Sequence, residues 1–209
     1  MRIFSYRGVP IRLHISFLIL GAAWVAYEGI SGGLNSALSI TAAGTALFGS
    51  VLLHEIGHSS MAKAFGISTR HITLYPFGGI AAIEKEPRSG SEEFFIAIAG
   101  PAVNFIIAGL LIPPFLLGYQ IVSWLIMINL VMGIFNLVPA YPMDGGRILR
   151  AWLSSKMRRT KATKISLNVS RIFSLAFVIF GILYNWVGLI LVGMFLWYAI
   201  NMERRRLLS

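Results

Sequence analysis

The chain has 209 residues, of which 56% are hydrophobic and only 12% are charged. A soluble core of this size does not need so much apolar surface, so the composition favours a membrane protein. The chain contains no cysteine, which excludes disulfides and thiolate metal ligands. The net charge of +10 raises the question of a nucleic-acid partner, which depends on where the charges fall.

Long apolar runs predict an all-α membrane protein with six transmembrane helices in a single domain, residues 1–209. The expected spans are residues 13–30, 37–65, 93–112, 119–138, 165–184 and 187–202. The first run follows a basic segment, as a signal peptide would, but we interpret it as a retained helix because the topology requires it. Residues 148–164 are basic with interspersed apolar residues, which predicts an interfacial amphipathic helix.

The region between the second and third spans, residues 66–92, differs in kind from the helices. Two short apolar segments, Ile72–Tyr75 and Ile80–Ile83, flank a run that contains Pro76, Gly78 and Gly79. This pattern predicts two strands in a hairpin or a re-entrant loop. A surface connector is the alternative.

Two later spans contain residues that interrupt a regular lipid-facing helix. Pro101 and Asn104 lie within the third span and indicate close packing or a kink. A pair of prolines at 113–114 predicts a turn after it. After the fourth span, Pro139, Pro142 and two following glycines predict a broken segment.

The basic residues are distributed asymmetrically over the predicted loops. All 18 Lys and Arg residues lie in the N-terminal segment, residues 63–92, residues 147–171 and the C-terminus. The loops around Ser31, Pro113 and Asn185 contain none. The positive-inside rule therefore predicts a multi-pass cell-membrane protein with both termini cytoplasmic. The charge then reflects topology and contact with anionic lipids, and no nucleic-acid partner is expected.

The second span contains the sequence His54-Glu55-Ile56-Gly57-His58. On a helix, His54 and His58 face the same way, one turn apart, and two imidazoles so placed can bind one zinc ion. Glu55 is then a candidate general base. Ionisable groups inside a membrane span are costly and usually functional. A pair of satisfied core histidines is the alternative.

Asp144, the only aspartate in the chain, supplies a candidate third ligand. His54 lies nine residues before Lys63, which places it roughly 13 Å below the cytoplasmic border at the rise of a helix. The break at Pro139 and Pro142 would let the Asp144 carboxylate turn towards this depth. Two histidines, one carboxylate and an open position match a catalytic zinc site. A helix cap or a turn residue paired with Arg147 is the alternative for Asp144.

Three motifs in order resemble the site-2 protease family of intramembrane metalloproteases. They are His54-Glu55-x-x-His58, Gly100-Pro101-x-x-Asn104 and Asn136-x-x-Pro139-x-x-Pro142-x-Asp144-Gly145-Gly146. The Phe77-Gly78-Gly79 loop is similar to that family's as well. The chain looks most like the archaeal and bacterial branch that includes the sporulation factor protease. Members of that branch often carry C-terminal CBS modules, which are not seen here, and no PDZ insertion is seen.

The resemblance implies cleavage of single-span membrane proteins, with one zinc ion per chain held by His54, His58 and Asp144. Glu55 would take the proton of a zinc-bound water and deliver it to the leaving nitrogen. Asn136 would donate a hydrogen bond to the developing oxyanion, or else serve as a helix-packing amide. His14 and His71 match no ligand spacing and are interpreted as an interfacial and a loop residue.

A protease must unwind a helical substrate, and the extended peptide then needs backbone partners that bulk water cannot supply inside a membrane. An exposed strand edge in the loop between the second and third spans would provide them. The expected substrate-binding residues are Ile72, Thr73, Leu74, Tyr75, Phe77, Gly78, Gly79 and Ile80.

Two other classes of protein share some of these features. An ion-coupled transporter would also have intramembrane His, Glu and Asp residues and a broken helix. The absence of an inverted repeat and the position of the polar groups near one face count against it. A non-catalytic scaffold would not explain why the ionisable residue Glu55 lies inside a membrane span. The expected partners are thus a transmembrane protein substrate, anionic lipids and a second copy of the chain in a homo-oligomer.

Overall fold

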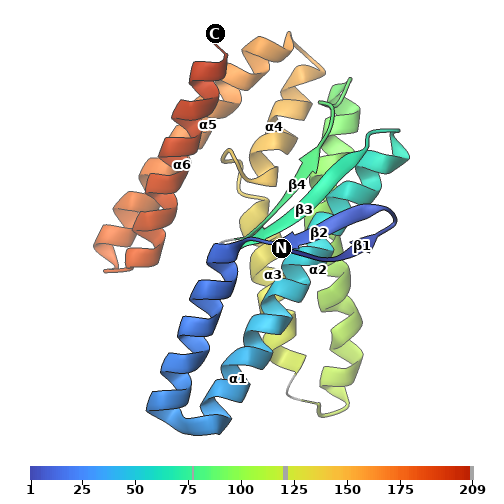
Figure 1. Ribbon diagram of the computed structural model, residues 1–209. Coiled ribbons are helices and arrows are strands. Elements are labelled where there is room, and N and C mark those ends of the chain that lie inside the picture. Colours follow the sequence, from blue (N-terminus) through green and yellow to red (C-terminus); the bar gives the residue numbers. More distant parts are fainter. Residues whose placement is uncertain (77, 120–121, 208–209) are drawn as a thin grey trace. The chain divides into compact units, whose positions relative to one another are not determined.

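The computed structural model describes residues 1–76, 78–119 and 122–207. It is mostly helical with one small sheet (Figure 1). The elements in chain order are β1 (Arg2–Tyr6), β2 (Val9–Leu13), α1 (Ile15–Ala64), β3 (Thr69–Tyr75), β4 (Gly78–Ile83), α2 (Gly90–Leu116), α3 (Ser123–Asn136), α4 (Asp144–Ser154), α5 (Arg159–Leu183) and α6 (Val187–Arg206).

The described residues form two compact units. The first unit combines residues 1–86 and 102–132, and the second combines residues 87–101 and 133–209. Helix α2 passes from the second unit to the first between Pro101 and Ala102. The prediction of a single domain over residues 1–209 stays a prediction.

In the first unit, α1 is a helical hairpin of 50 residues rather than one straight rod (Figure 1). Gly33 has φ +75° and ψ −172°, which interrupts the helix inside the predicted turn at residues 31–36. The second arm of α1 buries Val51, His54, His58 and Ala62, which recur every three or four residues, together with Gly57. That spacing is one helical face, and it contains both histidines of the motif.

The sheet of the first unit has the order β1-β2-β3-β4. Strands β2 and β3 are parallel, and the β1–β2 and β3–β4 pairs are antiparallel. Strands β3 and β4 overlap the two strands predicted from the sequence. Strands β1 and β2 were not predicted, because the basic residues of this short segment hide its alternation, so the all-α class was too narrow. Ile11, Ile72 and Leu74 form the buried part of the sheet.

Among the described residues, four helices are long and apolar enough to cross a membrane, namely α1, α2, α5 and α6. Helix α3 is apolar but has only 14 residues, fewer than the predicted span 119–138. Pro113 and Pro114 lie within the last turn of α2, so the turn predicted there was wrong. The carbonyl of Pro113 accepts the backbone N–H of Leu117, which continues the helical pattern past the prolines.

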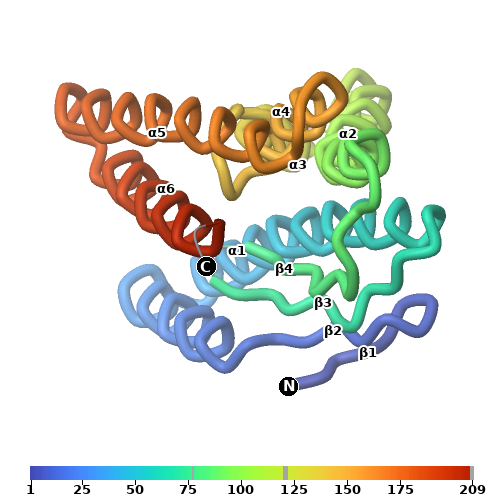
Figure 2. Tube along the Cα trace, turned by 90° about the horizontal axis from the view of Figure 1, so that it is seen from above, coloured from blue at the N-terminus to red at the C-terminus, as the bar shows by residue number. Residues whose placement is uncertain are grey.

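In the second unit, α5 and α6 are joined by a short turn at residues 184–186 (Figure 2). Ser174 donates a hydrogen bond from α5 to the carbonyl of Gly193 on α6, at 2.7 Å. The amphipathic helix predicted over 148–164 was wrong in its bounds. Helix α4 begins at Asp144 and ends at Ser154, and residues 159–164 belong to α5. The break between them carries no proline or glycine that would have marked it.

Candidate metal centre and active site

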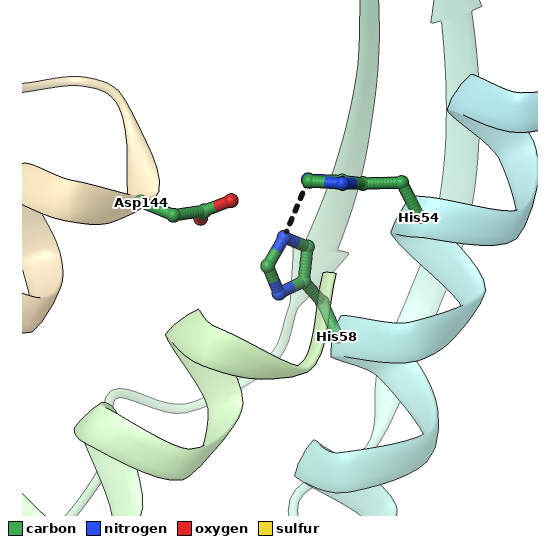
Figure 3. A group of neighbouring side chains, drawn as sticks. All are labelled: His54, His58 and Asp144. Carbon is green, nitrogen blue, oxygen red and sulfur yellow. Dashed lines mark hydrogen bonds between the residues drawn. The ribbon is translucent and has the colours of Figure 1, made fainter. Parts of the chain in front are cut away.

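His54 and His58 lie one turn apart on the second arm of α1, and both side chains are buried (Figure 3). Their Nε2 atoms are 3.0 Å apart, and the rings meet edge to face. This is a hydrogen-bond distance, and two imidazole nitrogens that face each other in this way can also share one cation. The predicted face-sharing of the two histidines is therefore confirmed.

The other ring nitrogen of His54 is occupied. His54 Nδ1 lies 2.6 Å from Oδ1 of Asn104 on α2, a buried residue of the same unit. A metal-binding histidine commonly donates its second N–H to an oxygen in this way, which fixes the ring orientation.

Glu55 is half-buried beside strand β4. Its Oε2 atom accepts a hydrogen bond from the backbone N–H of Ala81 at 3.1 Å. The approach is close, because a Cβ atom on Gly79 would lie 2.5 Å from Glu55 Cγ. Only glycine at position 79 lets the strand lie this near the carboxylate without displacing it.

In the second unit, α3 ends at Asn136 and α4 begins at Asp144, so the predicted broken segment is present. Asp144 is buried, and a carboxylate in the first turn suits the positive end of the helix dipole. Arg147 Nη1 lies 3.5 Å from Asp144 Oδ1, so the ion pair considered from the sequence also forms. A Cβ atom on Gly145 would overlap the backbone carbonyls of Leu137 and Val138, which requires glycine there.

A cluster of charged side chains fixes the rest of α4 within this unit. Glu93, 1% exposed, accepts hydrogen bonds from Nε and Nη2 of Arg150. Arg159 Nη2 lies 3.7 Å from the other oxygen of Glu93, and Arg150 Nη1 lies 3.7 Å from Glu203 Oε1. Tyr141 donates its hydroxyl to Glu203 Oε2 at 3.2 Å. Burial, followed by the Glu203 carboxylate, raises the pKa of the Tyr141 phenol, so the hydroxyl stays protonated.

His54 and His58 in the first unit and Asp144 in the second each offer one ligand atom for a metal ion. Figure 3 shows the two rings on α1 and the Asp144 carboxylate at the start of α4. Two imidazoles and one carboxylate fit zinc, and this set is found in catalytic sites that keep a position for water. The donor set therefore suits the ion that the sequence predicted.

The profile of peptidase family M50 matches residues 42–120 and 117–177, which together are more than half of the chain. The chain belongs to peptidase family M50. The matched residues include the histidine motif, Glu55, Asn136 and Asp144.

Individual relatives agree with this assignment. A zinc metalloprotease of Methanocaldococcus jannaschii is 41% identical over 98% of this chain and 60% of its own length. A putative zinc metalloprotease of Synechocystis is 41% identical over 72% of this chain and 43% of its own. The stage IV sporulation protein FB of Bacillus subtilis is 32% identical over 60% of this chain and 45% of its own. The chain thus spans about half the length of the curated relatives it matches.

A solved structure has the same fold. The site-2 protease from Methanocaldococcus jannaschii superposes with a TM-score of 0.71 at 41% identity, covering 97% of this chain and 94% of that one. The resemblance to the site-2 protease family is confirmed. The comparisons give no support to the transporter alternative.

The predicted substrate-binding loop is only partly available for a peptide to bind in this M50 chain. Residues 72–74 of β3 pair with β2 on one side, and residues 72–75 pair with β4 on the other. The expectation that β3 offers a free edge was therefore wrong. Among the described residues, β4 is an outer strand of the sheet. Phe77 lies outside the described residues.

Three further predicted residues have defined positions. Asn136 is the last residue of α3 and is partly buried. His14 caps the N-terminus of α1 by accepting the backbone N–H of Ser16, and its ring stacks on Tyr75. His71 lies in β3.

Sequence reasoning did not find the amides behind His54. Asn104 was interpreted as a packing or kink residue and as part of a family motif, without a partner, and Asn129 was not singled out. Both side chains are fully buried, and Asn104 Nδ2 donates to Asn129 Oδ1 at 2.9 Å. The available signal was their presence in apolar spans, because a buried amide is costly unless it is hydrogen-bonded.

Proposed function

We propose that this chain is an intramembrane zinc metalloprotease that hydrolyses peptide bonds of transmembrane proteins. The observation that carries the proposal is the facing pair of Nε2 atoms on His54 and His58, 3.0 Å apart in an M50 chain. Glu55 adjoins this pair in the sequence and is half-buried beside β4.

His54, His58 and Asp144 would hold the zinc ion in this proposal. Zinc bound there supplies a water of lowered pKa and a Lewis acid that polarises the scissile carbonyl. Glu55 takes the proton of the attacking water and passes it to the leaving nitrogen. Asn136 donates its side-chain N–H to the oxyanion that develops on the carbonyl oxygen.

The proposal has six membrane-spanning segments. The two arms of α1 cross separately, α3 crosses together with its flanking residues, and α2, α5 and α6 cross once each. The distribution of all 18 Lys and Arg residues supports cytoplasmic N- and C-termini in the cell membrane. The same residues would contact anionic lipids at that face. His54 then lies roughly 13 Å below the cytoplasmic border.

Substrate would bind as an added strand on the outer edge of β4. The edge adjoins the proposed base, because the Ala81 N–H donates to Glu55. Ile80 is 59% exposed, which leaves space for a side chain of the added strand. A peptide aligned on this edge gains the backbone partners that an unwound membrane segment lacks. The substrate class is single-span membrane proteins, and a homo-oligomer is compatible with this arrangement.

Glu55→Gln tests the proposed chemistry. The variant should retain one zinc per chain and lose about 10²–10⁴-fold in the rate of cleavage of a model transmembrane substrate. Zinc is measured by elemental analysis and cleavage by gel assay in proteoliposomes. Glu84→Gln, which alters an exposed carboxylate paired with Arg70, serves as the matched control. Parental turnover by Glu55→Gln would remove Glu55 from the mechanism.

A proline scan tests the proposed substrate edge separately. Proline at position 80, 82 or 83 should reduce cleavage where an outward N–H is lost, with zinc content unchanged. Positions 79 and 81 are left out because both contact Glu55. Parental rates at every position would reduce the loop to a connector and leave the zinc chemistry standing.

A further inference from the structure

A chain of four buried polar side chains extends from His54 across three helices of the first unit. Ser50 and His54 belong to α1, Asn104 to α2 and Asn129 to α3, and each is at most 4% exposed. Successive hydrogen-bonded atoms lie 2.6 Å apart for His54–Asn104, 2.9 Å for Asn104–Asn129 and 3.0 Å for Asn129–Ser50. Three of the four side chains are uncharged hydroxyl or amide groups, and the fourth is the imidazole of His54. Neutral hydrogen-bonded groups cost less to bury in an apolar environment than charged groups do.

The orientation of the Asn129 amide is fixed by a backbone carbonyl. Its Nδ2 atom donates to the carbonyl oxygen of Leu125 at 2.8 Å, and a carbonyl can only accept. The same Nδ2 atom donates to Ser50 Oγ, whose own hydrogen is directed to the carbonyl of Ala46 at 3.0 Å. The oxygen of the Asn129 amide must therefore face Asn104.

This orientation propagates to the histidine. Asn129 Oδ1 needs a donor, so Asn104 presents Nδ2 to it and Oδ1 to His54. An amide oxygen only accepts, so His54 Nδ1 must carry the hydrogen. In the neutral ring, Nε2 is then the unprotonated nitrogen, and this is the atom that faces His58.

We propose that Asn129 is a positioning residue that sets the tautomer of His54 through Asn104, so that Nε2 is held ready for a metal ion. The proposal rests on the proposed function in that His54 is a metal ligand. Asn104 alone does not determine the tautomer, because an amide turned by 180° would offer an N–H to His54. Asn129, tied to the backbone of its own helix, prevents that turn.

The parent protein provides the first test. Nitrogen NMR of ¹⁵N-histidine-labelled, zinc-free full-length chain, at a pH where the imidazoles are neutral, should show His54 protonated on Nδ1. His54→Gln assigns the signal. A ring protonated mainly on Nε2, or an equal mixture, would overturn the proposal. Zinc binding by a protein with that result would leave the proposed function intact.

A double-mutant cycle separates orientation from packing. Asn129→Leu should weaken zinc binding about tenfold, measured by chelator competition, because the Asn104 amide becomes free to turn. Asn104→Asp presents an accepting oxygen to His54 in either orientation but sets its other oxygen against Asn129 Oδ1, so this variant serves only as the background for the second substitution. In the Asn104→Asp background, Asn129→Leu should then cause no further loss. An equal loss in both backgrounds would show a packing role and contradict the proposal.

Ser50 and Ser174 supply matched controls for this cycle. Ser50→Ala removes one acceptor from Asn129, but the Leu125 carbonyl still fixes the amide, so zinc affinity should change less than twofold. Ser174→Ala removes an equally buried hydroxyl that bonds the Gly193 carbonyl in the second unit and has no bond to this chain. It should leave both affinity and the His54 signal unchanged. A tenfold loss in Ser50→Ala would contradict the assigned direction of the bonds.

Discussion

The two units fix their proposed metal ligands by different physical means. In the first unit, His54 is oriented by neutral amides, Asn104 and Asn129, whose hydrogen bonds run in one direction. In the second unit, the helix that begins with Asp144 is anchored by full charges, with Glu93 paired to Arg150 and Arg159. The first set of contacts uses only neutral groups, which lowers the cost of burying them, whereas the second set balances its charges by pairing them.

The largest effect is expected from breaking the charged anchor. Glu93→Gln removes the buried carboxylate that Arg150 and Arg159 share and leaves Arg150 only its longer contact with Glu203. This should lower the free energy of unfolding by about 3 kcal/mol. Unfolding by SDS in mixed micelles measures this. Glu84→Gln, at the exposed ion pair with Arg70, should change it by less than about 1 kcal/mol. Equal effects of the two substitutions would contradict the anchoring role of Glu93.

A smaller effect should follow from moving the backbone at Asp144. Gly145→Ala places a methyl group on the carbonyls of Leu137 and Val138, so the first turn of α4 must shift. We expect a loss of about 2 kcal/mol in unfolding free energy, together with weaker zinc binding. Gly109→Ala is the control, because its Cβ would meet open space on α2. Parental zinc affinity in Gly145→Ala would show that Asp144 does not depend on this turn.

The smallest effect on stability is expected at Tyr141, which bonds to Glu203 of the charged cluster. Tyr141→Phe removes the hydroxyl that donates to Glu203 and should cost about 1 kcal/mol. Because burial raises the pKa of Tyr141, the protonated phenol is favoured in the folded protein. Its contribution is complete below the ordinary tyrosine pKa of about 10 and declines as the pH rises above it. A pH series of parent minus variant unfolding free energies checks this; a difference that grows above that pH would have the wrong sign.

The sequence predicted the parts of the site that depend on local spacing. His54 and His58 follow from helical periodicity, and the break before Asp144 follows from Pro139 and Pro142, since proline cannot continue a helix. The inner position of β3 did not follow, because it depends on pairing with β2, which comes from a distant part of the chain.

The amide network shows the same limit. The apolar setting of Asn129 indicates that it needs a partner, but three helices must pack before Asn104 and Ser50 can be identified as that partner. The start of α5 at Arg159 was also not predictable, because residues 148–164 have one continuous amphipathic pattern with no sign of a break.

The zinc centre itself can be tested by X-ray absorption at the zinc edge of the full chain. The account predicts one zinc with two imidazole nitrogens at about 2.0–2.1 Å and oxygen ligands at about 2.0–2.2 Å. In Asp144→Ala, zinc should be lost or should keep the two imidazoles with its oxygen ligation altered. A parent spectrum with fewer than two imidazoles, or an unchanged spectrum and affinity in Asp144→Ala, would contradict the assignment of His54, His58 and Asp144.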